Sequence, residues 1–301
     1  MTASEVSGYL LLNKQAGLTS FESLGMIKKA FSTGKVCHTG TLDKFASGLL
    51  IILVGRAVKL SSWFSGCDKR YRGTIRLGIE TDTLDPEGQI IAEAPLPSRE
   101  TLEGVLPQFR GEILQAPPVY SAIHVQGERA HKLARSGAEV EMEKRPVTTY
   151  ALKITAWEPP LASIEVHCSK GTYIRSLARD MALAAGSRGH LVSLTRTRVA
   201  GFRLEEASEP VPEGLTGALR PIDTRAFEAL GLPWVTVDEE RACKIIQGKA
   251  LSQALGAKAP EFPDTPDSLS IGIFRENGEF VGIIEKKADG SLSYGYVYAG
   301  H

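Results

Sequence analysis

The chain has 301 residues, of which 43% are hydrophobic and 23% charged, and this composition excludes the disordered and fibrous classes of protein. Its longest apolar run, Leu49 to Val54, is too short to cross a bilayer, and the N-terminus lacks the basic segment of a signal peptide. The formal net charge is zero, which taken alone argues against a nucleic-acid partner.

The length and the cysteines give two further expectations. A chain of 301 residues exceeds the usual size of one hydrophobic core, so we expect one large and one small domain. The four cysteines, at positions 37, 67, 168 and 243, form no C-x-x-C pair and no compact disulfide framework. We therefore expect reduced thiols and a cytoplasmic location.

Charge is distributed unevenly along the chain. Residues 1–80 hold 11 Lys and Arg against 5 Asp and Glu, and residues 166–204 hold 7 against 1. Residues 81–165 and 205–301 are net acidic, with 8 basic residues against 13 acidic and 9 against 16. If the two basic stretches meet in the fold, they form a local site for a polyanion. The alternative is scattered solvated charge.

The first part of the chain predicts alternating strands and helices. Residues 8–14 predict a strand, and Thr19 with Glu22 predicts a capping box at the start of a helix. Residues 49–54 predict a strand buried on both faces, and residues 56–64 predict a helix. The turn H-T-G-T-L-D-K-F-A-S-G, which contains Asp43, precedes the buried strand.

The next predicted strand, at residues 69–78, has two different faces. Its apolar positions alternate with arginines, Tyr71, Ile75 and Leu77 against Arg70, Arg72 and Arg76. Residues 95–150 are richer in proline, glycine and acidic residues, so we expect surface loops there.

The second basic stretch predicts a strand and then a helix. Alternating Ile164, Val166 and Cys168 indicate the strand, and apolar residues between 174 and 185 recur at helical spacing. Arg175 and Arg179 fall outside the apolar face of this helix. The C-terminal part differs, since strand-like segments after residue 269 are separated by Asn277-Gly278 and Asp289-Gly290, both typical of hairpin turns. We expect a small β domain that begins near Trp234.

Several kinds of site have no support in the sequence. It contains no phosphate-binding loop, no dinucleotide fingerprint and no G-x-S-x-G elbow, and its six histidines show no metal-ligand spacing. For Asp43, the commonest role of an aspartate between glycines is to stabilise a turn or cap a helix. Arg175 favours another interpretation, because a cation in the first turn of a helix needs a nearby anion. That anion is Asp43, RNA phosphate or both, unless Arg175 is simply solvated.

Between residues 8 and 203, a series of motifs occurs in a fixed order. They are G-Y-L-L-L-N-K-x-x-G-L-T-S, H-T-G-T-L-D-x-x-A-S-G-L-L, D-K-R-Y-R-G, T-D-T-L-D-P-E-G, Q-A-P-P-V-Y-S-A-I, L-A-R-S-G, G-T-Y-I-R-S-L-A-R-D-M and L-x-R-T-R-V-x-x-F. This series resembles that of the TruB family of tRNA pseudouridine synthases. The C-terminal strands resemble, more loosely, the PUA-like RNA-binding domain that many family members carry.

The resemblance implies an α+β fold, with a mixed, largely antiparallel sheet and flanking helices in a catalytic domain over residues 1–230. A small β-rich, PUA-like RNA-binding domain over residues 234–301 completes it. The implied activity is isomerisation of uridine to pseudouridine at position 55 in the T loop of tRNA, on a base flipped out of the stack, without cofactor or metal. The implied partner is tRNA, with no membrane, no guide RNA and no obligatory protein partner.

The resemblance also implies roles for individual residues. Asp43 matches the catalytic aspartate, and the sequence leaves open whether it attacks C1′ or C6 or acts through a glycal. The implied substrate-binding residues are His38, which enters the RNA loop, Lys59 near the RNA, Tyr71 stacked on the flipped base, Tyr173 and Leu194 in the uracil pocket, and Arg175 paired with the catalytic carboxylate. Asp85 extends the charges around that arginine, and the glycines of the turn let the backbone approach the nucleotide.

The sequence departs from the family pattern at a few positions. Lys44 and Phe45 stand where Pro-Leu is usual, Ser47 replaces a usual Thr, and Gln15 replaces a usual Pro. Because proline fixes φ, we expect the loops here to be less rigid. Two alternatives remain: a non-catalytic RNA-binding protein on the same scaffold, and an enzyme that acts on another RNA or with a guide RNA. The short segment before Gly8 and the lack of a basic tail favour a stand-alone enzyme.

Overall fold

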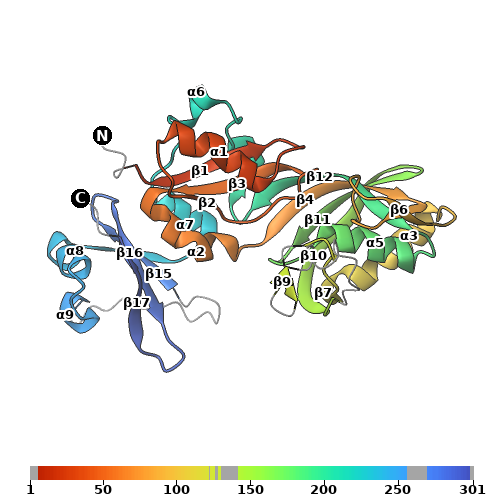
Figure 1. The fold of residues 1–301 in the computed structure, drawn as a ribbon. Coiled ribbons are helices and arrows are strands. Elements are labelled where there is room, and N and C mark those ends of the chain that lie inside the picture. The colour runs from red at the N-terminus through yellow and green to blue at the C-terminus, as the bar shows by residue number, and fades with distance from the viewer. Residues whose placement is uncertain (1–5, 122, 126–127, 130–141, 256–269, 299–301) are drawn as a thin grey trace.

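The computed structural model describes residues 6–121, 123–125, 128–129, 142–255 and 270–298 (Figure 1). The L-A-R-S-G motif and the proline-containing stretch at 260–266 lie outside these residues. Within the described part of the chain, no helix is long and apolar enough to cross a membrane.

A sheet of nine strands forms the centre of the described structure, in the order β1-β3-β12-β4-β11-β10-β7, with β2 on β3 and β13 on β12. β12 runs parallel to β3, and the other pairs in this sheet are antiparallel. The expected mixed, largely antiparallel sheet is confirmed. The strands are β1 (Gly8–Lys14), β2 (Val36–His38), β3 (Ser47–Val54), β4 (Lys69–Leu77), β7 (Gly111–Gln115), β10 (Arg145–Glu158), β11 (Leu161–Cys168), β12 (Gly189–Val199) and β13 (Phe202–Arg203).

Helices flank this sheet (Figure 1). The α-helices before the C-terminal part are α1 (Ser20–Ala30), α2 (Ser61–Ser65), α3 (Arg99–Val105), α5 (Ile174–Ala184), α6 (Pro212–Leu215) and α7 (Thr224–Leu230). The 3₁₀ helices are η1 (Gly55–Leu60), η2 (Leu106–Phe109) and η3 (Leu204–Glu206). The predicted capping box of α1 is present, because Thr19 and Glu22 each accept a hydrogen bond from the other's backbone N–H.

Strands β1 and β3 are buried on both faces, as the apolar run in the sequence predicts. One face packs with Leu24 and Ile27 of α1. The other packs with Phe64 of α2 and Phe227 of α7. The expected helix after β3 is also present, divided into η1 and α2. Because both faces are covered, this half of the sheet is a rigid base for the turn that carries Asp43.

The other half of the sheet packs against α5. Leu177 and Met181 of this helix are fully buried against Ile75 of β4 and Ile164 of β11. The long strands β4 and β12 lie side by side through the middle of the molecule and connect the two halves (Figure 1). The two basic stretches of the sequence therefore meet, since β4 belongs to the first and its neighbour β12 to the second.

The expectation that residues 95–150 form surface loops is wrong in part. This range contains α3, η2, β7 and the first residues of β10. Leu102, Val105 and Leu106 are buried against α5 and the sheet, and their spacing of three and four residues is that of a helix face. Two hairpins lie outside the main sheet, β5 (Ile79–Thr81) with β6 (Ile90–Glu93) and β8 (His124–Val125) with β9 (Glu128–Arg129).

The C-terminal part has its own sheet, in the order β14-β15-β16-β17. Its elements are β14 (Trp234–Val237), α8 (Glu239–Ile246), α9 (Leu251–Leu255), β15 (Ser270–Arg275), β16 (Phe280–Lys286) and β17 (Leu292–Val297). The predicted hairpins at Asn277-Gly278 and Asp289-Gly290 are confirmed. The sequence did not predict the parallel pairing of β14 or the helices α8 and α9. This sheet packs against α7, with Phe274 in edge contact with Phe227 at 5.1 Å between ring centres.

Candidate active site

A cavity of about 310 Å³ lies where the turn after β2 meets β4, β12 and the start of α5. It is lined by five of the seven predicted site residues, Asp43, Tyr71, Tyr173, Arg175 and Leu194. Segments that are far apart in the sequence thus supply one site. Among the described residues, no three His, Cys, Asp or Glu side chains converge in an arrangement that would hold a metal ion.

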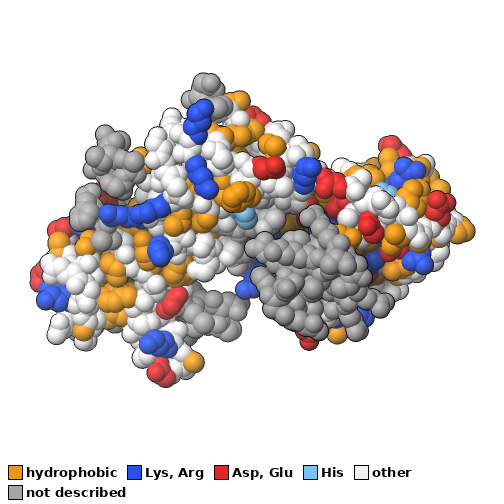
Figure 2. Space-filling model, in the orientation of Figure 1, with side chains coloured by type: hydrophobic (Ala, Val, Ile, Leu, Met, Phe, Trp, Pro, Cys, Tyr) orange, Lys and Arg blue, Asp and Glu red, His pale blue; other side chains and the backbone are white. Residues whose placement is uncertain are grey.

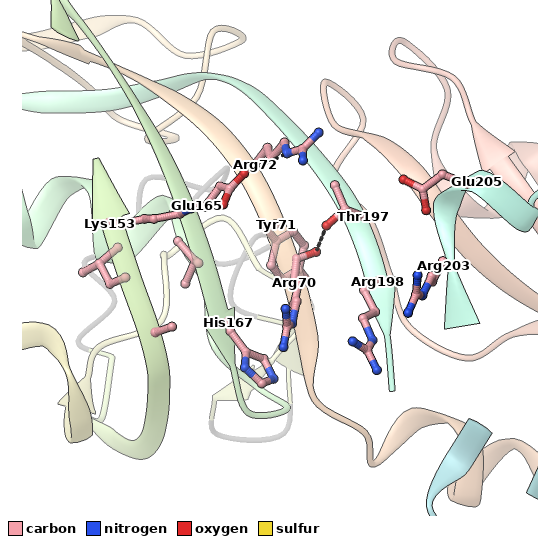
Figure 3. Close-up of a pocket in the computed structure, with 13 residues that line it drawn as sticks. Arg70, Tyr71, Arg72, Lys153, Glu165, His167, Thr197, Arg198, Arg203 and Glu205 are labelled. Carbon is pink, nitrogen blue, oxygen red and sulfur yellow. Dashed lines mark hydrogen bonds and ion pairs between the residues drawn. The ribbon is translucent and has the colours of Figure 1, made fainter. Parts of the chain in front are cut away.

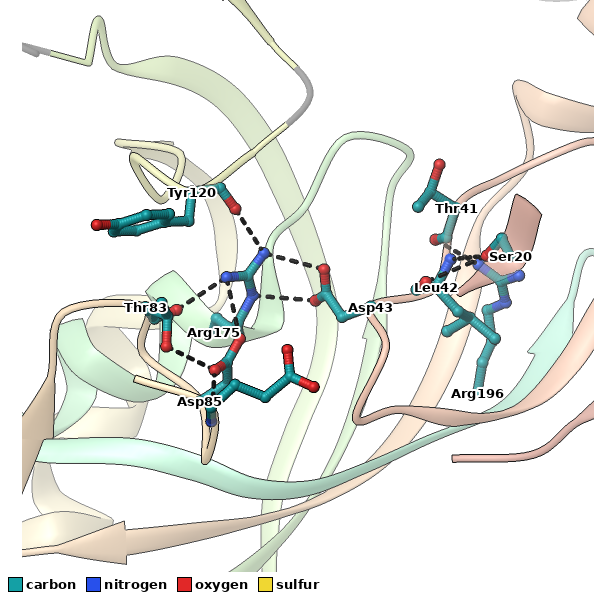
Figure 4. Close-up of polar contacts among 10 residues, drawn as sticks. Ser20, Thr41, Leu42, Asp43, Thr83, Asp85, Tyr120, Arg175 and Arg196 are labelled. Atoms are coloured by element: carbon teal, nitrogen blue, oxygen red, sulfur yellow. Dashed lines mark hydrogen bonds and ion pairs between the residues drawn. The ribbon is translucent and has the colours of Figure 1, made fainter. Parts of the chain in front are cut away.

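Asp43 and Arg175 form a bidentate ion pair in this cavity (Figure 4). Arg175 donates from Nε to Oδ2 and from Nη2 to Oδ1, each at 3.0 Å. The arginine side chain is 4% exposed, whereas the aspartate side chain is 33% exposed and lines the cavity. Two parallel hydrogen bonds fix the plane of the carboxylate as well as its position.

Every N–H donor of the Arg175 guanidinium has a protein acceptor. A guanidinium has five such donors, and two of them bind Asp43. The other three bind the carbonyl oxygen of Thr83 at 2.8 Å, the carbonyl oxygen of Tyr120 at 3.1 Å and Oδ2 of Asp85 at 3.3 Å. Arg175 is therefore not a solvated arginine, and its donors are used inside the protein and not by RNA phosphate.

The position of Arg175 in the first turn of α5 explains why two carboxylates surround it. A cation there faces the positive end of the helix, and the residue before the helix, Tyr173, makes no side-chain cap. Asp43 and Asp85 supply the compensating negative charge. Asp85, whose side chain is 8% exposed, is itself held by the Thr83 hydroxyl at 2.6 Å.

Arg196 of β12 fixes the turn that carries Asp43. This buried side chain donates to the carbonyl oxygens of Leu49 at 2.8 Å and Gly40 at 3.0 Å, one on each side of the aspartate. A Cβ on Gly48, whose φ is +104°, would lie 2.4 Å from the Arg196 carbonyl oxygen. The glycine at this position is thus required by close packing between β3 and β12. The approach of the turn backbone to a nucleotide stays a prediction.

Lys14 holds the same turn from the other side. Its fully buried ammonium donates to the carbonyl oxygens of Leu18 at 2.6 Å, Gln15 at 3.0 Å and Lys44 at 3.5 Å. Burial lowers the pKa of Lys14 to about 8, against a smaller opposing effect of the charge of Asp43. Main-chain anchors thus fix the turn in a chain that has glutamine and lysine where the family usually has proline.

Further contacts anchor the residues next to Asp43. The Ser20 hydroxyl is hydrogen bonded to both the backbone N–H and the carbonyl oxygen of Leu42. Phe45, one of the departures from the family pattern, packs against the main core. Lys44 forms an exposed ion pair with Glu87 at 3.8 Å. The departures at 44 and 45 therefore have partners of their own.

Two tyrosines and a leucine form the less polar wall of the cavity. Tyr71 and Leu194 are 8% and 6% exposed, and they come from neighbouring strands. Burial raises the pKa of Tyr71 and of Tyr173, so both phenols are neutral at pH 7. The backbone of Tyr173 is fixed by the Gln115 side chain, which accepts from its N–H at 2.8 Å and donates to its carbonyl oxygen at 3.1 Å.

The other two predicted site residues do not line the cavity. His38 ends β2 and is half-buried, and burial lowers its pKa, with a smaller effect from the charge of Arg196. Its buried Nδ1 has no hydrogen-bond partner among the described residues. Lys59 lies in η1 with an exposed side chain.

Lys69, Lys170 and Arg196 line the cavity, and the sequence reasoning did not single them out. Lys69 had a usable signal, because it lies two residues before Tyr71 and alternation places both on one face of β4. Burial lowers the pKa of Lys69. Arg196 lies in the motif L-T-R-T-R-V, but nothing in the local pattern indicates that it reaches across to the turn after β2.

Comparison with known proteins identifies the family of this chain. Residues 28–174 match the family model described as TruB family pseudouridylate synthase (N terminal domain). The chain is 39% identical over 295 residues to tRNA pseudouridine synthase B of Aromatoleum aromaticum, which covers 96% of this chain and 91% of that protein. It is 47% identical over 205 residues to the protein of the same name from Borreliella burgdorferi, covering 67% and 73% of the two chains.

Solved structures show the same fold. The structure titled "Crystal Structure of a Cbf5-Nop10-Gar1 Complex" contains a chain that matches 97% of this one with a TM-score of 0.68 and 22% identity. The match covers 84% of that chain, and its extent includes the C-terminal sheet. A mixed α+β fold of the pseudouridine synthase type is thus shown, with a C-terminal β-rich part consistent with a PUA-like domain. Since a family model and a relative 39% identical along nearly the whole chain both match, this protein belongs to the TruB family of pseudouridine synthases.

Proposed function

We propose that this protein isomerises uridine to pseudouridine at position 55 in the T loop of tRNA, with Asp43 as the nucleophile. The observation that carries the proposal is the pairing of Asp43 with a fully satisfied, buried arginine at the edge of a small cavity. The names of the relatives, tRNA pseudouridine synthase B, support tRNA as the substrate.

The reaction rearranges bonds within one nucleotide. The bond between N1 and C1′ breaks, the uracil rotates while it stays bound, and C5 bonds to C1′. The proton that C5 loses is balanced by one gained at N1, so no oxidant or reductant is needed. Attack of the carboxylate at C1′, its addition at C6 and a glycal route all require an ionised Asp43 beside the nucleotide, and all three remain open. The Asp43 side chain is 33% exposed and lines the cavity, so a nucleotide in the cavity can reach its oxygens.

The substrate uridine has to leave the RNA stack to reach Asp43. Unstacking costs a few kcal/mol, and less for a loop nucleotide than for one in a duplex. The cavity, at about 310 Å³, is at the small end of the range for ligand pockets and suits a single base. In the proposal, Tyr71 stacks on the flipped base, while Tyr173 and Leu194 confine it.

Two residues outside the cavity contact the RNA in this proposal. His38 lies near the turn that carries Asp43 and enters the space that the flipped base leaves in the loop. Because burial lowers its pKa, the ring is neutral at pH 7 and acts by its shape. Lys59, which is exposed on η1, faces the phosphate backbone.

We propose the division into a catalytic domain over residues 1–230 and an RNA-binding domain over residues 234–301. In support, the C-terminal strands form a sheet separate from the central one. The enzyme works on the T stem-loop in the cytoplasm, where it requires neither a guide RNA nor a partner protein.

Mapping the modified nucleotide tests this proposal. An unmodified tRNA transcript is incubated with the protein alone, and pseudouridine is located by chemical labelling and primer extension. We expect one pseudouridine, at position 55, and none in a control transcript with cytidine at that position. Pseudouridine at a different uridine would contradict the assigned target. If the protein modified no uridine in the tRNA transcripts, the proposed function would be wrong.

A further inference from the structure

The face of the central sheet opposite the cavity carries a row of one histidine and three arginine side chains across four adjacent strands. Register places His167 of β11 opposite Arg70 of β4, Arg70 opposite Arg198 of β12, and Arg198 opposite Arg203 of β13. Successive side chains of a strand point to opposite faces, so this row points away from Tyr71 and the cavity. Figure 3 shows the four side chains gathered on one side of the strands.

These four residues, here called the basic row, border a groove of about 600 Å³. Arg70 and Arg203 are exposed, and Arg198 is half-buried. Among the described residues, no carboxylate lies within ion-pair distance of these three arginines, although Glu205 also borders the groove. His167 differs, because its Nε2 contacts Asp68.

In a neighbouring row on the same face, the basic side chains are paired with a carboxylate of the protein. Glu165 of β11 lies opposite Arg72 of β4 and binds it at 3.0 Å, and it binds Lys153 of β10 at 2.8 Å. Like charges placed opposite each other on adjacent strands are destabilising. The basic row contains two such pairs of like charges, Arg70 with Arg198 and Arg198 with Arg203, and no carboxylate of the described part of the chain lies between the members of either pair.

The face of the molecule that Figure 2 shows carries charges of both signs. Figure 2 shows basic and acidic side chains interspersed on the face in view, as the zero net charge of the chain predicts. The basic row thus results from the meeting of the two basic stretches at β4, β11 and β12, and it is a local feature of a neutral protein.

We infer that the basic row binds the phosphate backbone of an RNA segment other than the loop that enters the cavity. The inference rests on the proposed function, which makes RNA the polyanion that this protein meets. Strands lie about 4.8 Å apart, so four of them span roughly 14 Å and face a short run of phosphates of one RNA strand. Tyr150, an exposed tyrosine whose ring lies 4.9 Å from that of His167, extends the row with a surface on which a base can stack.

Binding measurements with two RNAs test this inference. Arg70 and Arg203 are both changed to Gln, and affinity is measured for a whole unmodified tRNA and for an isolated T-arm hairpin over a range of salt concentrations. Each phosphate contact contributes about 0.9 to the slope of log K against log salt. We expect the slope for whole tRNA to fall by about two and its affinity at 0.1 M salt to fall about tenfold or more. Hairpin affinity should stay unchanged.

The matched control removes the same charge from the same face. Arg72→Gln with Lys153→Gln also deletes two cations, but both are paired with Glu165. We expect it to change the affinity for whole tRNA less than twofold. If both double variants lost the same affinity for whole tRNA, the effect would come from net charge alone. If the Arg70 and Arg203 double variant lost the same affinity for both RNAs, the basic row would bind the RNA whose loop enters the cavity. Either result overturns the inference. An unchanged affinity of the Arg70 and Arg203 double variant for whole tRNA also overturns it, and an acidic protein segment would then be the better candidate partner of the groove.

Folding and function are checked in parallel. Far-UV circular dichroism confirms the fold, and Arg203→Gln alone, which should lower the slope by about one, serves if the double variant unfolds. Pseudouridine formation by the wild type in whole unmodified tRNA is measured separately. If it fails, the proposed function is wrong, whereas the binding of the two RNAs still decides whether the basic row contacts RNA.

Discussion

Replacing Arg175 with methionine should reduce turnover far more than RNA binding. Methionine fills a similar volume but removes the charge and all five N–H donors, two of which hold Asp43. The carboxylate then loses the partner that fixes its plane. Loss of a preorganised charged donor at a reacting group typically costs two to three orders of magnitude in rate, so we expect kcat to fall about 100-fold or more. Affinity for tRNA should change less than about threefold, because no donor of Arg175 is free for phosphate.

The same substitution also costs stability, and the structure indicates where. Asp43 is one-third exposed and can be hydrated again, whereas Asp85, at 8% exposed, is left as a buried charge without its partner. Removing one partner of a buried ion pair costs about 3–5 kcal/mol. Adding Asp85→Asn removes that charge and keeps an oxygen for the Thr83 hydroxyl. The double variant should therefore regain stability in urea unfolding while its turnover stays low.

Arg179 provides the matched control for this experiment. It lies one turn further along α5, binds Asp180 at 2.7 Å and does not line the cavity. Arg179→Met should leave both turnover and tRNA affinity near the wild-type values. Single-turnover rates and filter binding are measured on the same preparations. Equal losses of rate and affinity in Arg175→Met would make this arginine a phosphate contact and refute the reasoning.

Three further predictions concern the cavity and its supports. Tyr71→Phe keeps the ring but not the hydroxyl, so the variant should retain its affinity for tRNA. A drop of about 100-fold in single-turnover rate would assign proton transfer to the hydroxyl, whereas an unchanged rate would limit Tyr71 to stacking. His38 has a lowered pKa and is neutral at pH 7, so His38→Ala should slow the reaction equally between pH 7 and 8.5, and a pH-dependent loss would contradict its role as a wedge. Lys14 has a folded-state pKa of about 8 against 10.5 unfolded, so between these values the unfolded chain binds more protons and stability rises with pH. The free energy of unfolding of the wild type relative to Lys14→Met should therefore increase by about 3 kcal/mol from pH 8 to 10.5 in urea titrations, and a flat difference would show that the lysine is not perturbed.

Local patterns were sufficient to predict much of the fold. The capping box at Thr19, the doubly buried β3, the two-faced β4 and the hairpins at Asn277-Gly278 and Asp289-Gly290 each depend on neighbouring residues, and each is present. The parallel pairing of β14 depends on contacts distant in sequence and left no local signal. The prediction for residues 95–150 is wrong in part because prolines and glycines recur through the range, whereas the helical spacing of Leu102, Val105 and Leu106 is confined to five residues.

The candidate site divides in the same way. Arg175 was identifiable because a cation in the first turn of a helix needs an anion, and the structure supplies both Asp43 and Asp85. The supports of the turn were not identifiable, because Lys14 and Arg196 act on backbone carbonyl oxygens that carry no side-chain signature. They also hold this turn in place at positions where the sequence alone, lacking the usual prolines, indicated a looser loop.

The most direct test of the central claim is the Asp43→Asn variant in the pseudouridine assay. Asparagine has nearly the same shape and still accepts a hydrogen bond from Arg175, but its amide is not a nucleophile. We expect the variant to bind unmodified tRNA with an affinity near that of the wild type and to form no pseudouridine at position 55, even after long incubation at excess enzyme. Pseudouridine formed by the variant at the wild-type rate would contradict the claim that Asp43 carries out the reaction.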